Sequence, residues 1–101
     1  MTPLSAADET RDLKAVHYDM LVADQCGLVD DSVIAGYRVE YEAVVARDGL
    51  DETEQQEQRL AALIAFDYEY QNRGLGGSRA WCREEGVEGA RRLAAFAGKE
   101  G

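Results

Sequence analysis

The sequence is poor in the features that mark membrane, disulfide-rich and metal-binding chains. Its 101 residues include one proline, one histidine and two cysteines. The longest nearly unbroken apolar run, Leu60–Phe66, is far shorter than the roughly 20 residues that a membrane-spanning helix needs. The first residues carry neither a basic segment nor an apolar segment of the signal-peptide kind. We therefore expect no contact with a membrane, and a cytoplasmic location.

The few cysteine and histidine residues also limit the chemistry. Cys26 and Cys82 are too far apart for a CxxC metal site and too few for a disulfide framework, so reduced, packed thiols are predicted. His17 lies at the edge of an apolar stripe and is expected in the core, and no nucleophile motif accompanies it. No Glu-x-x-His pair occurs. We expect no metal, no cofactor and no enzyme, although a catalytic pair of Asp67 and His17 stays as a third alternative.

What the sequence does contain is helix-forming residues, mainly Ala, Glu, Leu, Arg and Gln. They predict an all-α fold, a small bundle of about four helices joined by short loops, in one domain spanning residues 1–101. Asp51 with Glu54, and Ser5 with Asp8, have the spacing of capping boxes, and glycines follow the expected helix ends. The predicted helices cover about residues 6–26, 32–48, 52–73 and 79–97, with flexible ends.

The predicted helices differ in how apolar residues surround them. The helix over 6–26 has one apolar stripe, which is typical of a surface helix. The helices over 32–48 and 52–73 are apolar nearly all round, which exceeds what one small domain can bury. We therefore expect a homodimer or docking onto a large partner, with a compact monomer as the alternative. Asp67 falls among the apolar residues of its helix, so burial beside Arg38, His17 or a tyrosine hydroxyl is predicted.

The helix over 79–97 contains two glycines, Gly86 and Gly89, and each costs about 1 kcal/mol relative to alanine. They share a stripe with Cys82 and Leu93, so they can let a neighbouring helix approach closely. We favour one continuous helix. The alternative is a break at Gly86 into two short helices.

Charge is the strongest indication of function. The net charge is -9, but residues 1–72 hold 16 acids and 5 bases while residues 73–101 hold 4 acids and 6 bases. Acids mixed with tyrosines favour docking onto a protein partner with a basic surface, and they disfavour direct DNA binding through the acidic part. The alternative is that the acidic surface binds no partner and only keeps the chain soluble. The predicted partner-binding residues are Asp8, Asp12, Asp19, Glu52, Glu54, Glu57, Tyr68 and Tyr70.

This profile of a very small, acidic, helical chain is similar to that of phage-encoded inhibitors such as anti-CRISPR proteins, some of which mimic DNA. The resemblance covers size and charge, and it implies no particular site residue. Immunity proteins, antitoxins and small phage structural proteins share the profile. We expect an interaction module, in its specific form an inhibitor that occupies a basic nucleic-acid-binding surface. The alternative is a homo-oligomeric structural or assembly protein with the helices over 32–48 and 52–73 at the interface.

Overall fold

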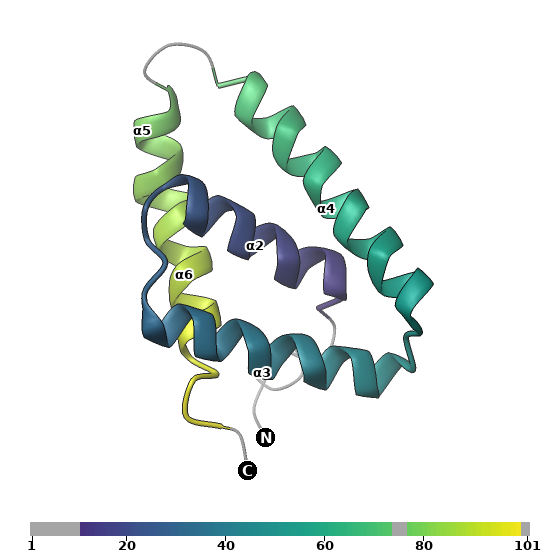
Figure 1. Cartoon of the computed structure of the whole chain (residues 1–101). Coiled ribbons are helices and arrows are strands. Elements are labelled where there is room, and N and C mark those ends of the chain that lie inside the picture. The colour runs from purple at the N-terminus through teal and green to yellow at the C-terminus, as the bar shows by residue number, and fades with distance from the viewer. Residues whose placement is uncertain (1–10, 74–76, 100–101) are drawn as a thin grey trace, which may run out of the picture.

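The structure, a computed structural model, describes residues 11–73 and 77–99. Its elements are α2 (Leu13–Gln25), α3 (Asp31–Asp48), α4 (Glu52–Gln71), α5 (Gly77–Trp81), the π-helical turn η1 (Cys82–Gly86) and α6 (Val87–Ala94). No strand occurs in these two ranges. The expected all-α fold is confirmed, because α5, η1 and α6 follow one another as a single rod beside the three longer helices (Figure 1).

Aspartates fix where the longer helices begin. Asp51 accepts a hydrogen bond from the Glu54 amide at 2.8 Å, and the Glu54 carboxylate accepts one from the Asp51 amide at 2.9 Å, so the expected capping box forms. Asp30 caps α3 through the Val33 amide at 2.9 Å. These bonds satisfy amide groups that a helix start leaves without a partner.

The first helix of the described residues begins later than predicted. α2 begins at Leu13, and Asp12 caps it by accepting a hydrogen bond from the Ala15 amide at 2.9 Å. A start near residue 6 was expected from Ser5 and Asp8, which lie outside the described residues.

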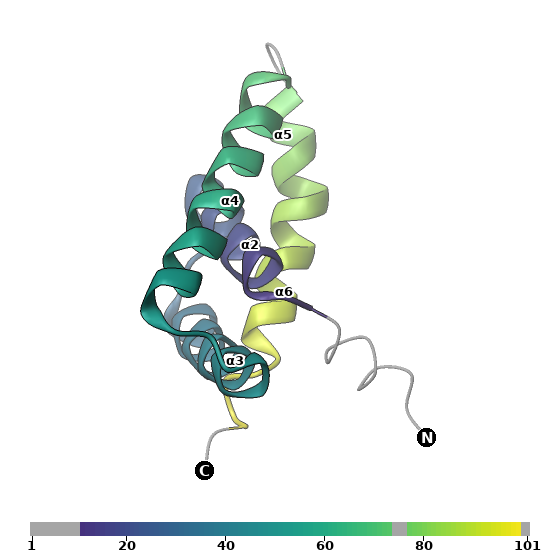
Figure 2. The same ribbon diagram turned by 90° about the vertical axis from the view of Figure 1, so that its right-hand side faces the viewer.

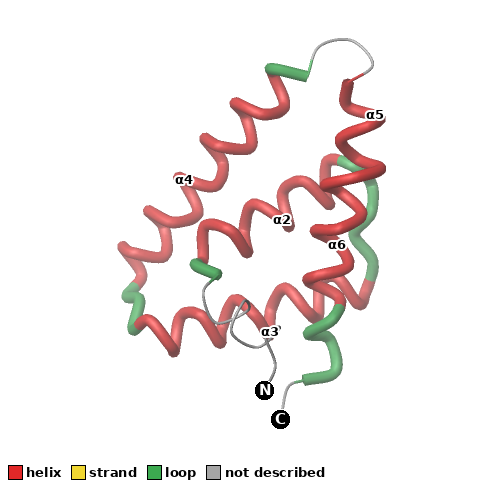
Figure 3. The backbone as a smooth tube through the Cα atoms, turned by 180° about the vertical axis from the view of Figure 1, so that it is seen from behind, coloured by secondary structure: helices red, strands yellow, loops and turns green. Residues whose placement is uncertain are grey.

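Helix α2 lies in the middle of the bundle. α4 crosses it on one side, and α3 and α6 pack against it on the others, as the views in Figures 1 to 3 agree. The prediction of a surface helix is wrong, because α3, α4 and α6 all pack against α2. Asp19 on that helix is buried and makes ion pairs with arginines instead.

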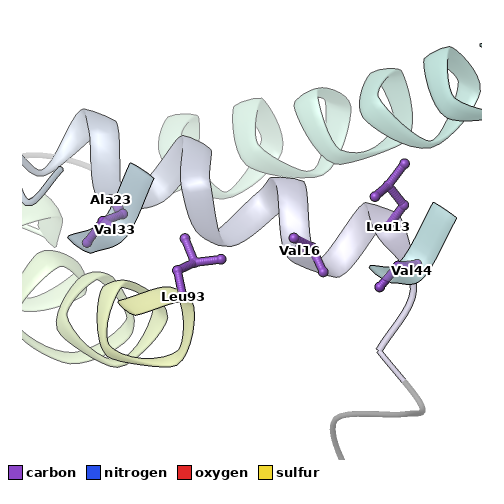
Figure 4. Packing of buried hydrophobic residues seen from close by; sticks show 6 residues of the cluster. All are labelled: Leu13, Val16, Ala23, Val33, Val44 and Leu93. Atoms are coloured by element: carbon purple, nitrogen blue, oxygen red, sulfur yellow. The ribbon is translucent and has the colours of Figure 1, made fainter. Parts of the chain in front are cut away.

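The hydrophobic core is small and is centred on α2 (Figure 4). α3 and α6 close it by an unusually near approach of their backbones. A Cβ atom at Gly36 of α3 would stand only 1.7 Å from the carbonyl oxygen of Leu93 on α6. The residues of the central cluster are Leu13, Val16, Ala23, Val33, Val44 and Leu93.

The helical backbone runs through Gly86 without a break, but it forms a π turn there. Gly86 and Gly89 make room for side chains from α2 and its C-cap. A Cβ atom at Gly86 would lie 3.0 Å from the Cys26 sulfur, and one at Gly89 would lie 3.0 Å from the Asp19 carboxylate. The glycines therefore serve close packing, by side chains rather than by a neighbouring backbone.

Cys26 and Cys82 form a disulfide bond, so the prediction of reduced thiols is wrong. The two residues are 56 positions apart in sequence, yet their Cα atoms lie 5.5 Å apart. Sequence spacing could not show this, because only the packing of the α2 end against η1 brings the cysteines together. The bond joins the C-terminal end of α2 to η1 in the rod formed by α5, η1 and α6.

Candidate protein-interaction surface

Helix α4 turns four large apolar side chains away from the bundle. The exposed fractions are 56% for Leu60, 43% for Leu63, 61% for Ile64 and 68% for Tyr68. Their spacing of three, four and eight positions places them on one side of the helix, which we call the α4 outer face. Single exposed apolar residues are ordinary, whereas a contiguous patch is typical of an interaction site.

The opposite side of α4, which packs on α2, carries smaller and polar residues. Ala62 is fully buried there, and the Gln58 side chain accepts a hydrogen bond from the Lys14 amide at 3.0 Å. Further along, the Phe66 ring lies 5.8 Å from the ring of the buried Trp81. α4 thus lies at the edge of the bundle (Figure 2). Four of its large apolar side chains stay exposed.

Asp67 is exposed, and the prediction that it is buried and paired is wrong. It lies on the α4 outer face next to Ile64 and Tyr68, and it makes no ion pair with any residue that the structure describes. The apolar residues around it have the spacing of a core-facing stripe. They face solvent because α2 packs against the Ala62 side of α4 instead.

Three acids at the start of α4 are exposed, as the sequence predicted for Glu52, Glu54 and Glu57. Glu54 belongs to the capping box, and Glu52 lies 3.4 Å from the guanidinium of Arg59. Glu57 lies three positions before Leu60, so it continues the α4 outer face toward the helix start. A carboxylate therefore flanks the apolar patch at each end, Glu57 before it and Asp67 within its last turn.

Asp19 does not belong to an exposed acidic surface, in contrast to the prediction. It is 5% exposed and is held by Arg92 from α6, with both contacts at 3.0 Å, and by Arg11 at 2.9 Å. Arg11 also lies 3.0 Å from Glu40, which is 2% exposed. The hydrogen bond to Asp19 raises the pKa of Arg92. The ion pairs hold Asp19 and Glu40 in the interior, where neither carboxylate is available to a partner.

A sequence signal for the burial of these two acids was present. Asp19 lies three positions after Val16 and four before Ala23, so it shares their buried stripe. Glu40 lies four positions before the buried Val44 on α3, so it too faces the core. The helical spacing of these acids therefore predicts their inward position, although they are not apolar.

The remaining predicted partner-binding residues are scattered. Asp12 is exposed but serves as the cap of α2, and Asp8 lies outside the described residues. Tyr68 is exposed on the α4 outer face. Tyr70 is 44% exposed, and its ring stacks on Phe66 at 5.9 Å. Of the predicted residues that the structure describes, Glu57 and Tyr68 lie with the apolar patch.

A half-buried polar cluster joins α2, α3 and α4. His17 Nδ1 lies 2.7 Å from the Tyr37 hydroxyl, and the Tyr41 hydroxyl donates a hydrogen bond to Gln55 at 3.1 Å and accepts one from Arg59. Burial and, second, the charge of Arg59 lower the pKa of His17. Burial and the neighbouring Tyr41 raise the pKa of Tyr37 to about 12. The imidazole is therefore neutral near pH 7 and acts here as a hydrogen-bond partner between helices.

Asp67 and His17, the alternative catalytic pair, do not lie together. Asp67 lies on the α4 outer face, whereas His17 faces Tyr37 in the interior cluster. In residues 11–73 and 77–99, no group of three or more histidine, cysteine or acidic side chains could hold a metal ion. None of the helices in the same ranges is long and apolar enough to cross a membrane.

Comparison with protein-family models, with curated proteins and with solved structures finds no match to this chain.

Proposed function

We propose that this chain is a non-catalytic protein-interaction module that binds its partner through the α4 outer face. The observation that carries the proposal is the exposure of Leu60, Leu63, Ile64 and Tyr68 along one side of a helix that packs on α2 with its other side. When an amphipathic helix binds in an apolar groove, side chains at this spacing make the main contacts with the groove.

The carboxylates that flank the apolar patch indicate which charge the partner should carry. Glu57 and Asp67 lie beside the apolar patch, and the whole chain carries a net charge of -9. A complementary partner has an apolar groove with basic residues at its rim, because such a rim speeds encounter and fixes orientation. The apolar side chains supply the burial, since exposed charges alone contribute little affinity.

An inhibitor that occupies a basic nucleic-acid-binding surface is the finer form of this proposal. It is supported by the acids of α4 and by the net charge, but not by Asp19, which is buried.

The disulfide weighs against a cytosolic version of such an inhibitor. Disulfides persist in oxidising compartments and are rare in the cytosol, so we propose that the folded chain works in an oxidising compartment and not in the cytoplasm.

The α4 outer face also supports homo-oligomeric assembly as a second candidate. Two α4 helices packed antiparallel about Ile64 would bring Leu60 of one copy against Tyr68 of the other, because both lie four positions from Ile64. The pairing is therefore self-complementary. Each copy carries a charge of -9, so salt should strengthen this contact by screening repulsion, whereas salt should weaken docking onto a basic partner.

A photo-crosslinking experiment tests the proposal. A photoreactive residue at position 64 should capture a defined protein in the native host, whereas one at position 34, where Ile34 of α3 is 41% exposed, should not. The double variant Leu60→Gln with Ile64→Gln, made with a crosslinker at position 68, should lose the product. Equal capture at positions 34 and 64 would show that α4 has no special role. Capture of a second copy would select the assembly candidate.

A further inference from the structure

An open groove lies between the C-terminal end of α2 and the α5–η1 segment, away from the α4 outer face. Its volume is about 630 Å³, within the range of roughly 300 to 1,000 Å³ that small-molecule sites occupy. The Cys26–Cys82 disulfide lies in its wall. The other lining residues are Gln25, Leu28, Ser78, Arg79, Arg83 and Val87.

The charge of this groove is opposite to that of the chain. The sequence has 20 acids and 11 bases, yet the described residues that line the groove include two arginines and no acid. Arg79 and Arg83 are both exposed, and neither makes an ion pair with a described residue. Like charges four positions apart on a helix destabilise it slightly. Arg83 also borders a second hollow that holds Glu84, Glu85 and Glu88, but it makes no ion pair with these described acids.

Other arginines of the same region are neutralised. Arg73 pairs with Glu69 and Glu85, Arg91 pairs with Glu88, and Arg92 pairs with Asp19. Glu85 and Glu88 of this rod are thus used in ion pairs, whereas none of the described residues that line the groove is an acid. Two guanidinium groups that line one groove and lack an ion-pair partner among the described residues suit an oxyanion, which each can bind with parallel hydrogen bonds.

The groove is also preformed. The disulfide fixes one wall to the other, with the Cα atoms of its cysteines 5.5 Å apart. Gly86 lets the two walls pack closely, because a Cβ atom there would lie 3.0 Å from the Cys26 sulfur and 3.3 Å from Leu28. A site held in its binding geometry loses less conformational freedom when a ligand enters.

We propose that this groove binds a small amphiphilic anion. A carboxylate or phosphate headgroup binds between Arg79 and Arg83, with the hydroxyl of Ser78 and the amide of Gln25 as further donors in the lining. A short apolar body lies over Leu28, Val87 and the disulfide. The site is independent of the α4 outer face, so its failure would leave the proposed function standing.

An NMR titration of the whole oxidised chain tests the site, with octanoate, octyl phosphate, inorganic phosphate and octylamine as probes. Octanoate, octyl phosphate or both should give saturable amide shifts confined to residues 25–28 and 77–87. The stronger of the two identifies the headgroup. Inorganic phosphate should bind about tenfold or more weakly, because it lacks the apolar body, and octylamine should leave these amides unchanged.

Matched variants separate the groove from the net charge. Arg79→Gln with Arg83→Gln should weaken binding of the anionic probe about tenfold or more, because charge-assisted hydrogen bonds are lost. Arg38→Gln with Arg91→Gln makes the same change in net charge outside the groove and should leave affinity unchanged. Circular dichroism verifies that both variants stay helical. The inference is overturned if no anionic probe saturates, if octylamine binds equally well, if the shifts fall on the α4 outer face, or if both variant pairs bind alike.

Discussion

Asp19 of α2 and Arg92 of α6, 73 positions apart in sequence, meet in a two-point ion pair. Arg92 Nε lies 3.0 Å from one carboxylate oxygen of Asp19, and its Nη2 lies 3.0 Å from the other. Gly89, one turn before Arg92, leaves the space that the Asp19 carboxylate occupies. An acid that would be taken for surface charge is thereby a buried link between two helices.

Asp19→Ala should lower the free energy of unfolding by about 2–3 kcal/mol, because it removes charge-assisted hydrogen bonds from Arg11 and Arg92 while Arg11 keeps Glu40 as a partner. Urea denaturation at neutral pH measures the change. Asp24→Ala, at an exposed position on the same helix, should change stability by less than about 0.5 kcal/mol. Similar losses in both variants would contradict the buried network.

Gly36→Ala should destabilise the chain by about 3 kcal/mol or more, because the added Cβ would stand 1.7 Å from the Leu93 carbonyl oxygen and the α3 and α6 backbones must separate. Thermal unfolding followed by circular dichroism measures it. Gly98→Ala is the control, since no atom lies within 4 Å of the Cβ position there. An unchanged melting temperature for Gly36→Ala would refute the close α3–α6 contact.

Removal of the disulfide should lower stability by about 4 kcal/mol, from the loop-closure entropy that a cross-link over 56 positions takes from the unfolded chain. Denaturation of the wild type with and without a reducing agent measures this. The double variant Cys26→Ser with Cys82→Ser should match the reduced wild type and show no response to the reductant. If an alkylating agent blocks both thiols of the native protein without prior reduction, the cysteines are free and the disulfide is refuted.

His17 should titrate below its ordinary pKa of 6.5, because burial and Arg59 disfavour its charged form. The folded state then binds the proton less readily than the unfolded state, so this group lowers stability as the pH falls below 6.5 and has no effect above it. His17 is the one histidine of the chain, so its ring signals give the pKa directly by NMR. A measured value above 6.5 would be inconsistent with the neutral, hydrogen-bonded ring.

The double change Leu60→Gln with Ile64→Gln should leave the free energy of unfolding within about 0.5 kcal/mol of the wild type, because both side chains already face solvent. Ala62→Gln, on the buried side of the same helix, should destabilise strongly through overpacking. Urea denaturation compares the two. A large loss in the outer variant would mean that the α4 outer face is covered by the chain itself.

The sequence by itself determined the helical class and several local boundaries. The capping box of Asp51 and Glu54 and the stop at Gly49 were recognisable because their interactions join residues a few positions apart. Gly49 has a φ of 63°, which glycine adopts readily. Such short-range geometry follows from the order of the residues and needs no knowledge of neighbouring helices.

The tertiary structure decided which side of each helix is buried. Asp19 was expected outside and lies inside, whereas Asp67 was expected inside and lies outside. An apolar or polar stripe gives a helix a phase, but which phase faces the bundle depends on the helices that pack on it. For α4 that contact is α2, which covers the Ala62 side.

The same reason governs the cysteines and the candidate sites. Cys26 and Cys82 meet only because the end of α2 packs on η1, and that packing also forms the arginine-lined groove. The α4 outer face exists because one small bundle cannot cover every apolar side of its helices. Local interactions made the helices predictable, whereas burial, pairing and exposure are properties of contacts between segments far apart in sequence, and only the assembled fold specifies them.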